Sequence, residues 1–120
     1  MTSSGQPFEI ETLDSASGAK IFKLSGTLTI QTLFDFQHSV REETDKAIIV
    51  DLTNVAYMDS AGLGCVIGAL TSCERTNRGF AITGVSERIR TLFAVARVDG
   101  LLPCFDSVQA AEAAITSRGT

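Results

Sequence analysis

The chain of 120 residues contains 44% hydrophobic and 20% charged residues and carries a formal net charge of −4. This size and balance favour one globular domain with its own core over a disordered chain. The negative charge disfavours general electrostatic binding to nucleic acid, and the apolar runs are too short to span a bilayer.

The first part of the chain predicts a β-hairpin followed by a helix. Apolar and polar residues alternate around Phe8–Thr12, as in a half-exposed strand, and residues 14–18 carry a turn signal. A second strand over residues 19–25 should end at the segment Gly26–Thr29. A helix is then expected from about Ile30 to Glu43. Its inward stripe consists of Leu33, Phe36, Gln37 and Val40.

The middle of the chain predicts a buried strand that leads into a second helix. Residues 47–52 are apolar up to Asp51, as in a central strand covered on both faces. A loop is expected over residues 53–59, and a helix from Ser60 to about Thr76 that Gly79 ends. Ser60 is the expected N-cap of this helix, because a serine hydroxyl readily accepts from the free amides of a first turn.

The last third of the chain predicts a strand over residues 80–83 and a helix capped by Ser86 and ended by Gly100 and Pro103. The inward face of that helix holds Ile89, Leu92, Phe93 and Ala96. A small edge strand is expected over residues 103–105. Asp106 or Ser107 should cap a final helix, which turns Val108, Ala111 and Ile115 inward.

A hairpin followed by alternating helices and strands is typical of an α/β domain. We expect a mixed, mostly parallel sheet of four to five strands with about four helices. The domain should occupy residues 7–117, between a flexible lead-in at residues 1–6 and a tail at 118–120. The N-terminus lacks the basic and apolar regions of a secretory signal.

The helix that begins at Ser60 has two faces of different character. Its buried face carries Leu63, Val66, Ile67, Leu70 and Cys73. Its opposite face gathers the small residues Ala61, Gly64, Cys65, Gly68 and Ser72. Each glycine inside a helix costs about 1 kcal/mol relative to alanine. This face therefore either packs closely against another element of the fold or forms a smooth platform for a partner. We favour the platform because larger residues already occupy the core side.

The residues that could carry catalysis do not form a known constellation. Met58 stands where the Gly-x-Ser-x-Gly nucleophile motif needs glycine, and nothing places His38 beside Ser60. Asp51 could resemble a phospho-accepting aspartate, but residues 25–27 lack the acidic pair that would hold magnesium. No phosphate-binding glycine loop and no Cys-x-x-Cys pair occur. We therefore expect no enzymatic activity, no metal and no cofactor.

The segment Asp51–Gly64, which ends in Asp59-Ser60-Ala61-Gly62-Leu63-Gly64, resembles the signature of the bacterial anti-sigma-factor antagonists. These are single-domain members of the STAS family. The resemblance extends over nearly the whole chain. It includes the segments Gly26–Leu28, Gly84–Ser86, Arg90–Phe93 and Leu101–Ser107.

The resemblance implies a cytoplasmic phosphoprotein that regulates transcription by partner switching. A GHKL-type anti-sigma serine kinase would phosphorylate Ser60, and a PPM-type serine phosphatase would reverse the modification. The unphosphorylated chain would bind the kinase and free a sigma factor. The residues expected to contact the partner are Thr29, Asp59, Ala61, Gly62, Gly64, Cys65 and Gly68. At Thr29 the chain departs from the Gly-x-Leu-Asp loop that is common in the family, which bears on the choice of kinase.

Two alternatives follow from the sequence. Ser60 either only caps its helix or also accepts a phosphate. Correspondingly, the chain is either a reversible phospho-switch or a constitutive STAS adaptor subunit of a lipid-transport or stress-signalling assembly.

Overall fold

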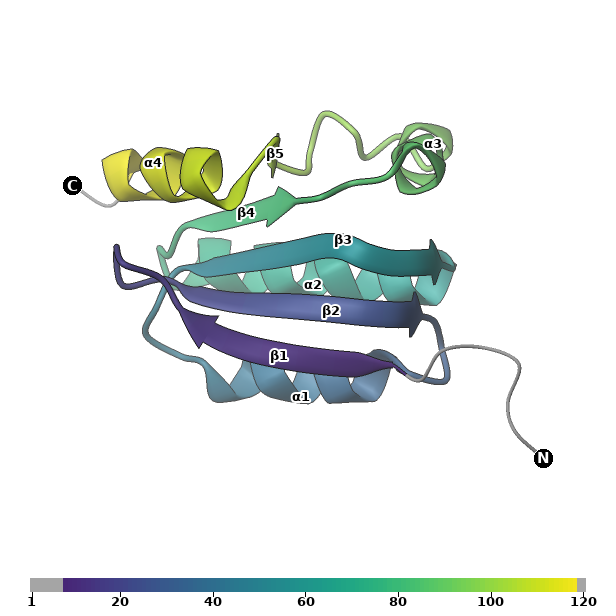
Figure 1. The fold of residues 1–120 in the computed structure, drawn as a ribbon, viewed down its shortest axis with the longest axis horizontal. Coiled ribbons are helices and arrows are strands. Elements are labelled where there is room, and N and C mark those ends of the chain that lie inside the picture. Colours follow the sequence, from purple (N-terminus) through teal and green to yellow (C-terminus); the bar gives the residue numbers. More distant parts are fainter. Residues whose placement is uncertain (1–7, 119–120) are drawn as a thin grey trace.

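The computed structural model describes residues 8–118 and contains a five-stranded sheet in the order β1-β2-β3-β4-β5 (Figure 1). The first two strands pair antiparallel, and the other neighbours pair parallel. The strands are β1 (Glu9–Asp14), β2 (Lys20–Leu28), β3 (Ile48–Met58), β4 (Phe80–Thr83) and β5 (Cys104–Phe105). The predicted mixed, mostly parallel α/β sheet is confirmed. The predicted lead-in at residues 1–6 lies outside the described residues, as do positions 119–120 of the predicted tail.

Four helices cover the sheet within the described part of the chain: α1 (Leu33–Glu42), α2 (Ser60–Arg75), α3 (Glu87–Val95) and α4 (Val108–Arg118). Figure 1 shows α1 and α2 side by side behind β1, β2 and β3, whereas α4 lies next to β4 and β5. The larger hydrophobic cluster includes apolar residues of α1, α2 and α3. None of the helices within residues 8–118 is long and apolar enough to cross a membrane.

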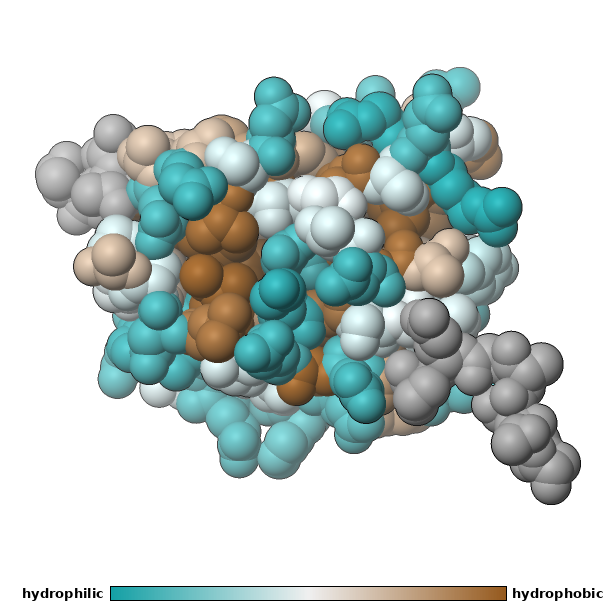
Figure 2. Space-filling model, viewed as in Figure 1, coloured by the Kyte–Doolittle hydropathy of each residue, from teal (hydrophilic) through white to brown (hydrophobic). Residues whose placement is uncertain are grey.

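The opposite face of the sheet is covered only in part. A smaller cluster joins Ala19, Ile21, Ile49 and Ala81 of the hairpin and sheet to Ala111 and Ile115 of α4. The inward face predicted for the last helix is confirmed at Ala111 and Ile115. Figure 2 shows a brown strip on this face, while much of the surface around it is teal or white. The sheet therefore has its main core on the side of α1 and α2.

Strands β2 and β3 both extend beyond their predicted ends. The expected break at Gly26–Thr29 and the expected loop over residues 53–59 are wrong, because these two segments pair with each other. Leu28 lies opposite Met58, and Gly26 has a φ of 93° where the ladder shifts register. In β3 the buried residues after Leu52 recur every third position, at Val55 and Met58. This spacing hides the period of two by which a strand is recognised.

Two helices end differently from the prediction. Asn77, not Gly79, takes the left-handed conformation after α2, with φ 62°, and Arg78 N then donates to Cys73 O at 2.8 Å. Gly79 is small for a different reason: a Cβ there would lie 2.8 Å from Cβ of Ile115. Helix α3 likewise ends at Val95, and the left-handed residue after it is Arg97, with φ 62°, well before Gly100. Ala96, predicted to face inward, is exposed.

Helix α1 begins at Leu33 rather than at the predicted Ile30. A tight turn precedes it, in which Leu33 N donates to Thr29 O at 2.8 Å and Thr32 Oγ1 donates to Thr27 O at 2.7 Å. The predicted cap of α3 is confirmed, because Ser86 accepts from Ile89 N. Of the two candidates before α4, Ser107 accepts from Ala110 N at 3.0 Å.

The glycines of α2 predict opposite effects of alanine at two positions. A Cβ at Gly62 would collide with the Leu28 carbonyl oxygen, whereas a Cβ at Gly68 would meet nothing within 4 Å. Gly62→Ala should lower the free energy of unfolding by about 1–3 kcal/mol through overpacking. Gly68→Ala should raise it by about 0.5–1 kcal/mol through helix propensity. Urea denaturation of both variants checks this, and equal stabilities would contradict the placement of Gly62 inside the fold.

Candidate functional site

Helix α2 begins where β2 and β3 end together, and its N-cap is Asp59. The Asp59 backbone is extended, and its Oδ1 accepts from Gly62 N at 2.8 Å. Its Oδ2 accepts from Ile30 N at 3.2 Å, and its own amide donates to Leu28 O at 3.2 Å. One side chain thus joins the start of α2 to the loop that leads into α1, at the end of β2.

Ser60 is not the N-cap, and the predicted cap is wrong by one residue. Because β3 continues to Met58, Asp59 is the one non-helical residue left before α2, and Ser60 is already the first helical residue. Ser60 is exposed. Within residues 8–118 its hydroxyl forms no hydrogen bond, so it is free to react or to contact a partner. It also lies at the positive end of the α2 dipole.

Three exposed apolar side chains belong to the segments that meet near Asp59. Ile30 is 58% exposed, Phe34 is 62% exposed and Tyr57 is 46% exposed. Ile30 is bonded to Asp59 through its amide, Tyr57 precedes Asp59 by two residues, and Phe34 lies in the first turn of α1. We call these three residues the apolar rim. The sequence pattern did not indicate them, because residues 53–59 suggested a loop and Phe34 lies outside the inward stripe of α1.

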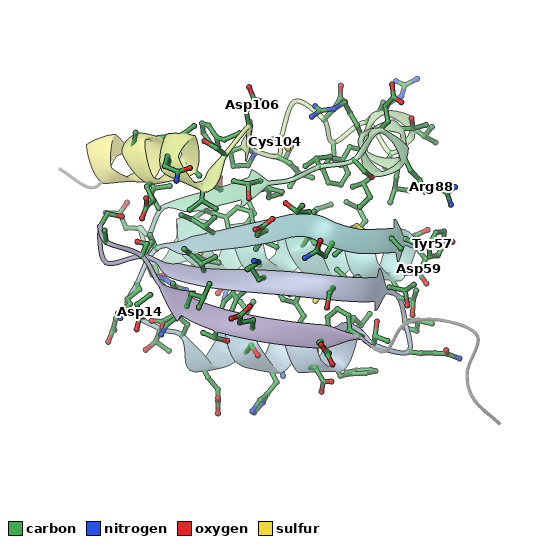
Figure 3. The ribbon with its side chains drawn as sticks, viewed as in Figure 1. Asp14, Tyr57, Asp59, Arg88, Cys104 and Asp106 are labelled. Atoms are coloured by element: carbon green, nitrogen blue, oxygen red, sulfur yellow. The ribbon has the colours of Figure 1, made fainter. Side chains whose placement is uncertain are left out.

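A charged cluster around Asp14 lies at the end of the sheet opposite to Asp59. Figure 3 shows Tyr57, Asp59 and Arg88 at the same end of the molecule and Asp14 at the opposite end. Lys20 and Lys46 approach Asp14 Oδ1 at 2.8 and 3.1 Å. Hydrogen bonds from these lysines hold the pKa of Asp14 below its ordinary value. The Asp14 cluster therefore closes the hairpin, and it lies far from Ser60.

The small-residue face of α2 divides into an outer and an inner part. Gly64 and Gly68 are exposed, with open space where a Cβ would be. Ala61 and Cys65 are half-buried, and Cys65 Sγ lies 3.8 Å from the Leu33 carbonyl oxygen of α1. Gly62, expected on the partner surface, is buried against β2. Close packing inside the fold is therefore the role of Gly62.

A groove of about 380 Å³ runs between α1 and α2, and we call it the α1–α2 groove. From α1 it is lined by Gln37, Val40 and Arg41, and from α2 by Gly64, Cys65, Gly68, Ala69, Ser72 and Arg75. Three of the small residues predicted to contact a partner or face it, Gly64, Cys65 and Gly68, thus line one concave surface. The platform suggested by the sequence is one wall of a groove.

Thr29 lies in the loop that Asp59 holds. Its amide donates to Thr32 Oγ1 at 2.9 Å, and its own Oγ1 accepts from Gln31 N at 3.2 Å. Its side chain is therefore engaged in shaping the loop, beside Ile30. Asp51 is buried in β3, where it accepts from Thr53 Oγ1 at 2.6 Å.

The remaining chemically versatile residues have structural settings. His38 is exposed on α1 and lies 3.3 Å from Glu42, four residues further on. Burial raises the pKa of Cys65, Cys73 and Cys104, so all three thiols are less nucleophilic than a free cysteine. Among the residues placed by the structure, no group of three metal-ligating side chains is found.

Comparison with known proteins agrees with this fold. The family model of the STAS domain matches residues 8–111. An anti-sigma-B factor antagonist of Staphylococcus epidermidis is 35% identical over 83 residues, which cover 67% of this chain and 77% of the relative. The crystal structure of an anti-sigma factor antagonist from Mycobacterium paratuberculosis superposes with a TM-score of 0.80 at 16% identity, covering 91% of this chain and 94% of that one. SpoIIAA, an anti-sigma factor antagonist solved in its unphosphorylated form, superposes with a TM-score of 0.72 at 18% identity, covering 93% and 98%.

Because Asp59 caps α2 and Ser60 does not, replacing each with alanine should change the free energy of unfolding by different amounts. Asp59→Ala removes the cap and the bond to Ile30 N, and should lower the free energy of unfolding by about 1–2 kcal/mol. Ser60→Ala should change it by less than about 0.5 kcal/mol, because the hydroxyl is exposed. Chemical denaturation measures both. A larger loss for Ser60→Ala than for Asp59→Ala would show that serine is the cap after all.

Proposed function

The chain belongs to the STAS domain family, and on this premise we propose that it is an anti-sigma-factor antagonist switched by phosphorylation of Ser60. In its unphosphorylated form it binds a cognate anti-sigma serine kinase of the GHKL type and so frees a sigma factor. Phosphorylation ends this binding, and a PPM-type serine phosphatase restores it. The protein acts in the cytoplasm, where transcription takes place, and is itself a substrate and binding partner rather than an enzyme.

The observation that carries the proposal is the exposed, unbonded hydroxyl of Ser60 beside a cap that another residue supplies. If Ser60 were the cap, its hydroxyl would be committed to a backbone amide of α2. Asp59 makes that bond instead. A serine that does no capping at the first position of a helix is available to a kinase, which favours the phospho-switch over the reading in which Ser60 only caps.

The local electrostatics suit a phosphate at this position. The first amides of α2 and the helix dipole favour a negative group on Ser60. Phosphorylation adds nearly two negative charges beside the carboxylate of Asp59. Because that carboxylate is already bonded to Gly62 N and Ile30 N, the fold can accept the group without rearrangement. The expected effect is therefore a change of surface rather than a change of fold.

The surface around Ser60 also suits a partner that leaves on phosphorylation. The apolar rim exposes Ile30, Phe34 and Tyr57 on the segments that meet at Asp59. Apolar contacts next to Ser60 would require its hydroxyl to lose water, which is tolerable for a neutral group and costly for a phosphate. The apolar rim, which favours binding of the kinase, thus also makes this binding sensitive to phosphorylation of Ser60. SpoIIAA, which has the same fold, was solved in its unphosphorylated form.

Phosphorylation itself is the first expected outcome. Incubation with the serine kinases of the same organism that resemble anti-sigma factors, in the presence of ATP, should place one phosphate on Ser60. Mass spectrometry of the digested protein locates it. Ser60→Ala should keep its affinity for the kinase and resist release, whereas Ser60→Asp should bind about tenfold or more weakly. Phosphate at another residue, or equal affinities of the two variants in calorimetry, would favour a constitutive adaptor.

The apolar rim gives a second expected outcome. Phe34→Ala should weaken kinase binding at least about fivefold, because exposed aromatic anchors dominate interfaces. Val95→Ala is the matched control, since Val95 is 77% exposed at the end of α3 and lies outside the rim. Both variants should unfold at nearly the wild-type denaturant concentration. If Val95→Ala weakens binding as much as Phe34→Ala, the interface does not lie at the start of α2.

A further inference from the structure

The α1–α2 groove has a charge opposite to that of the molecule as a whole. The chain has a formal net charge of −4. The groove, however, is lined by Arg41 and Arg75 and by no acidic residue. Both arginines are exposed, and neither forms a salt bridge with another residue in the described part of the chain. Two unpaired guanidinium groups on opposite helices are therefore available to anionic groups that enter the groove.

The α2 wall of the groove has the shape that receives another helix. Gly64, Gly68 and Ser72 follow one another at intervals of four residues, so they form one row along the helix. In most helices such a row is a ridge of side chains, which packs into the groove of a neighbour. Here the row is nearly bare, and apart from the neighbouring backbone of α2 a Cβ at Gly64 or Gly68 would have no atom within 4 Å. The ridge of an incoming helix can therefore lie close to the α2 backbone.

We propose that the α1–α2 groove receives an acidic helix of the anti-sigma kinase, whose carboxylates pair with Arg41 and Arg75. The inference rests on the proposed function and adds a second contact to it. The groove lies along the same helix that Ser60 begins, so a helix seated there holds the kinase in a fixed position relative to the phosphoacceptor. Contacts at the apolar rim then depend on whether Ser60 is phosphorylated, and the two arginines favour an acidic partner.

Charge reversal tests the pairing. The probe is the anti-sigma kinase that phosphorylates the wild-type chain, and the measurement is calorimetry at low and physiological salt. Arg41→Glu/Arg75→Glu should bind about tenfold or more weakly, and Arg41→Lys/Arg75→Lys should retain most of the affinity. The affinity of the reversed variant should also depend less on salt than that of the wild type. Arg90→Glu/Arg97→Glu carries the same change of net charge on exposed residues outside the groove and should keep nearly the wild-type affinity.

Two cysteines provide an independent footprint of the groove. Cys65 lines the groove, whereas Cys104 lies in β5, outside it, and both are half-buried free thiols. Alkylation with iodoacetamide at about pH 9, where both thiols with raised pKa react, is followed by mass spectrometry. Bound kinase should slow the labelling of Cys65 at least about fivefold and leave Cys104 unchanged. Protection of both, or of neither, would contradict a helix in the groove.

The outcomes separate this inference from the function on which it rests. Both the proposed function and the groove are supported if three results are obtained together. The wild-type chain binds the kinase, the reversed variant binds it at least about tenfold more weakly, and bound kinase protects Cys65 but not Cys104. If the charge-reversed variant binds the kinase as tightly as the wild type does, and Cys65 stays reactive in the complex, the groove is not the docking site. The proposed switch at Ser60 would then still stand. If the wild-type chain binds no kinase, the proposed function fails, and the occupant assigned to the groove fails with it.

Discussion

The carboxylate of Asp59 bonds to two parts of the molecule that are distant in sequence. One oxygen accepts from Gly62 N at the start of α2, and the other accepts from Ile30 N in the loop before α1. The extended pairing of β2 with β3 brings these amides together, because Leu28 and Met58 end the two strands side by side. These hydrogen bonds fix the starts of α1 and α2 relative to the sheet. The Ser60 hydroxyl takes no part in them. A serine in this position can change its charge without disturbing the residues that hold it.

The glycines of α2 show how the helix divides stability from binding. Gly62 is required by packing, since a side chain there would collide with the Leu28 carbonyl. Gly64 and Gly68 have open space around them, and each costs about 1 kcal/mol relative to alanine. These two glycines lower the stability of the helix, and packing does not require them. A role in binding explains them, because they let a partner lie close to the α2 backbone. The same helix therefore carries a phosphoacceptor at its start and an open groove along its length.

Much of the fold follows from sequence patterns, and the exceptions have physical reasons. The buried run of β3 and the cap at Ser86 could be predicted because period and local capping decide them. The ends of β2 and β3 could not, because Gly26 and the shifted register replace the alternation of a regular strand. That one error displaced the cap of α2 from Asp59 to Ser60 and hid Tyr57. The left-handed residues Asn77 and Arg97 were missed because glycines stood nearby. The groove depends on how α1 and α2 pack, which periodicity alone does not specify.

A local switch predicts a local spectroscopic response. The most direct measurement is a backbone amide NMR spectrum of the protein before and after stoichiometric phosphorylation by its kinase. The shifts should concentrate in the loop before α1, the end of β3 and the first turns of α2. Amides of α4, which packs on the other face of the sheet, and amides of β4, the strand that α4 contacts, should keep their positions. Shifts of similar size throughout β4 and α4 would contradict a surface switch and show that phosphorylation acts by changing the fold.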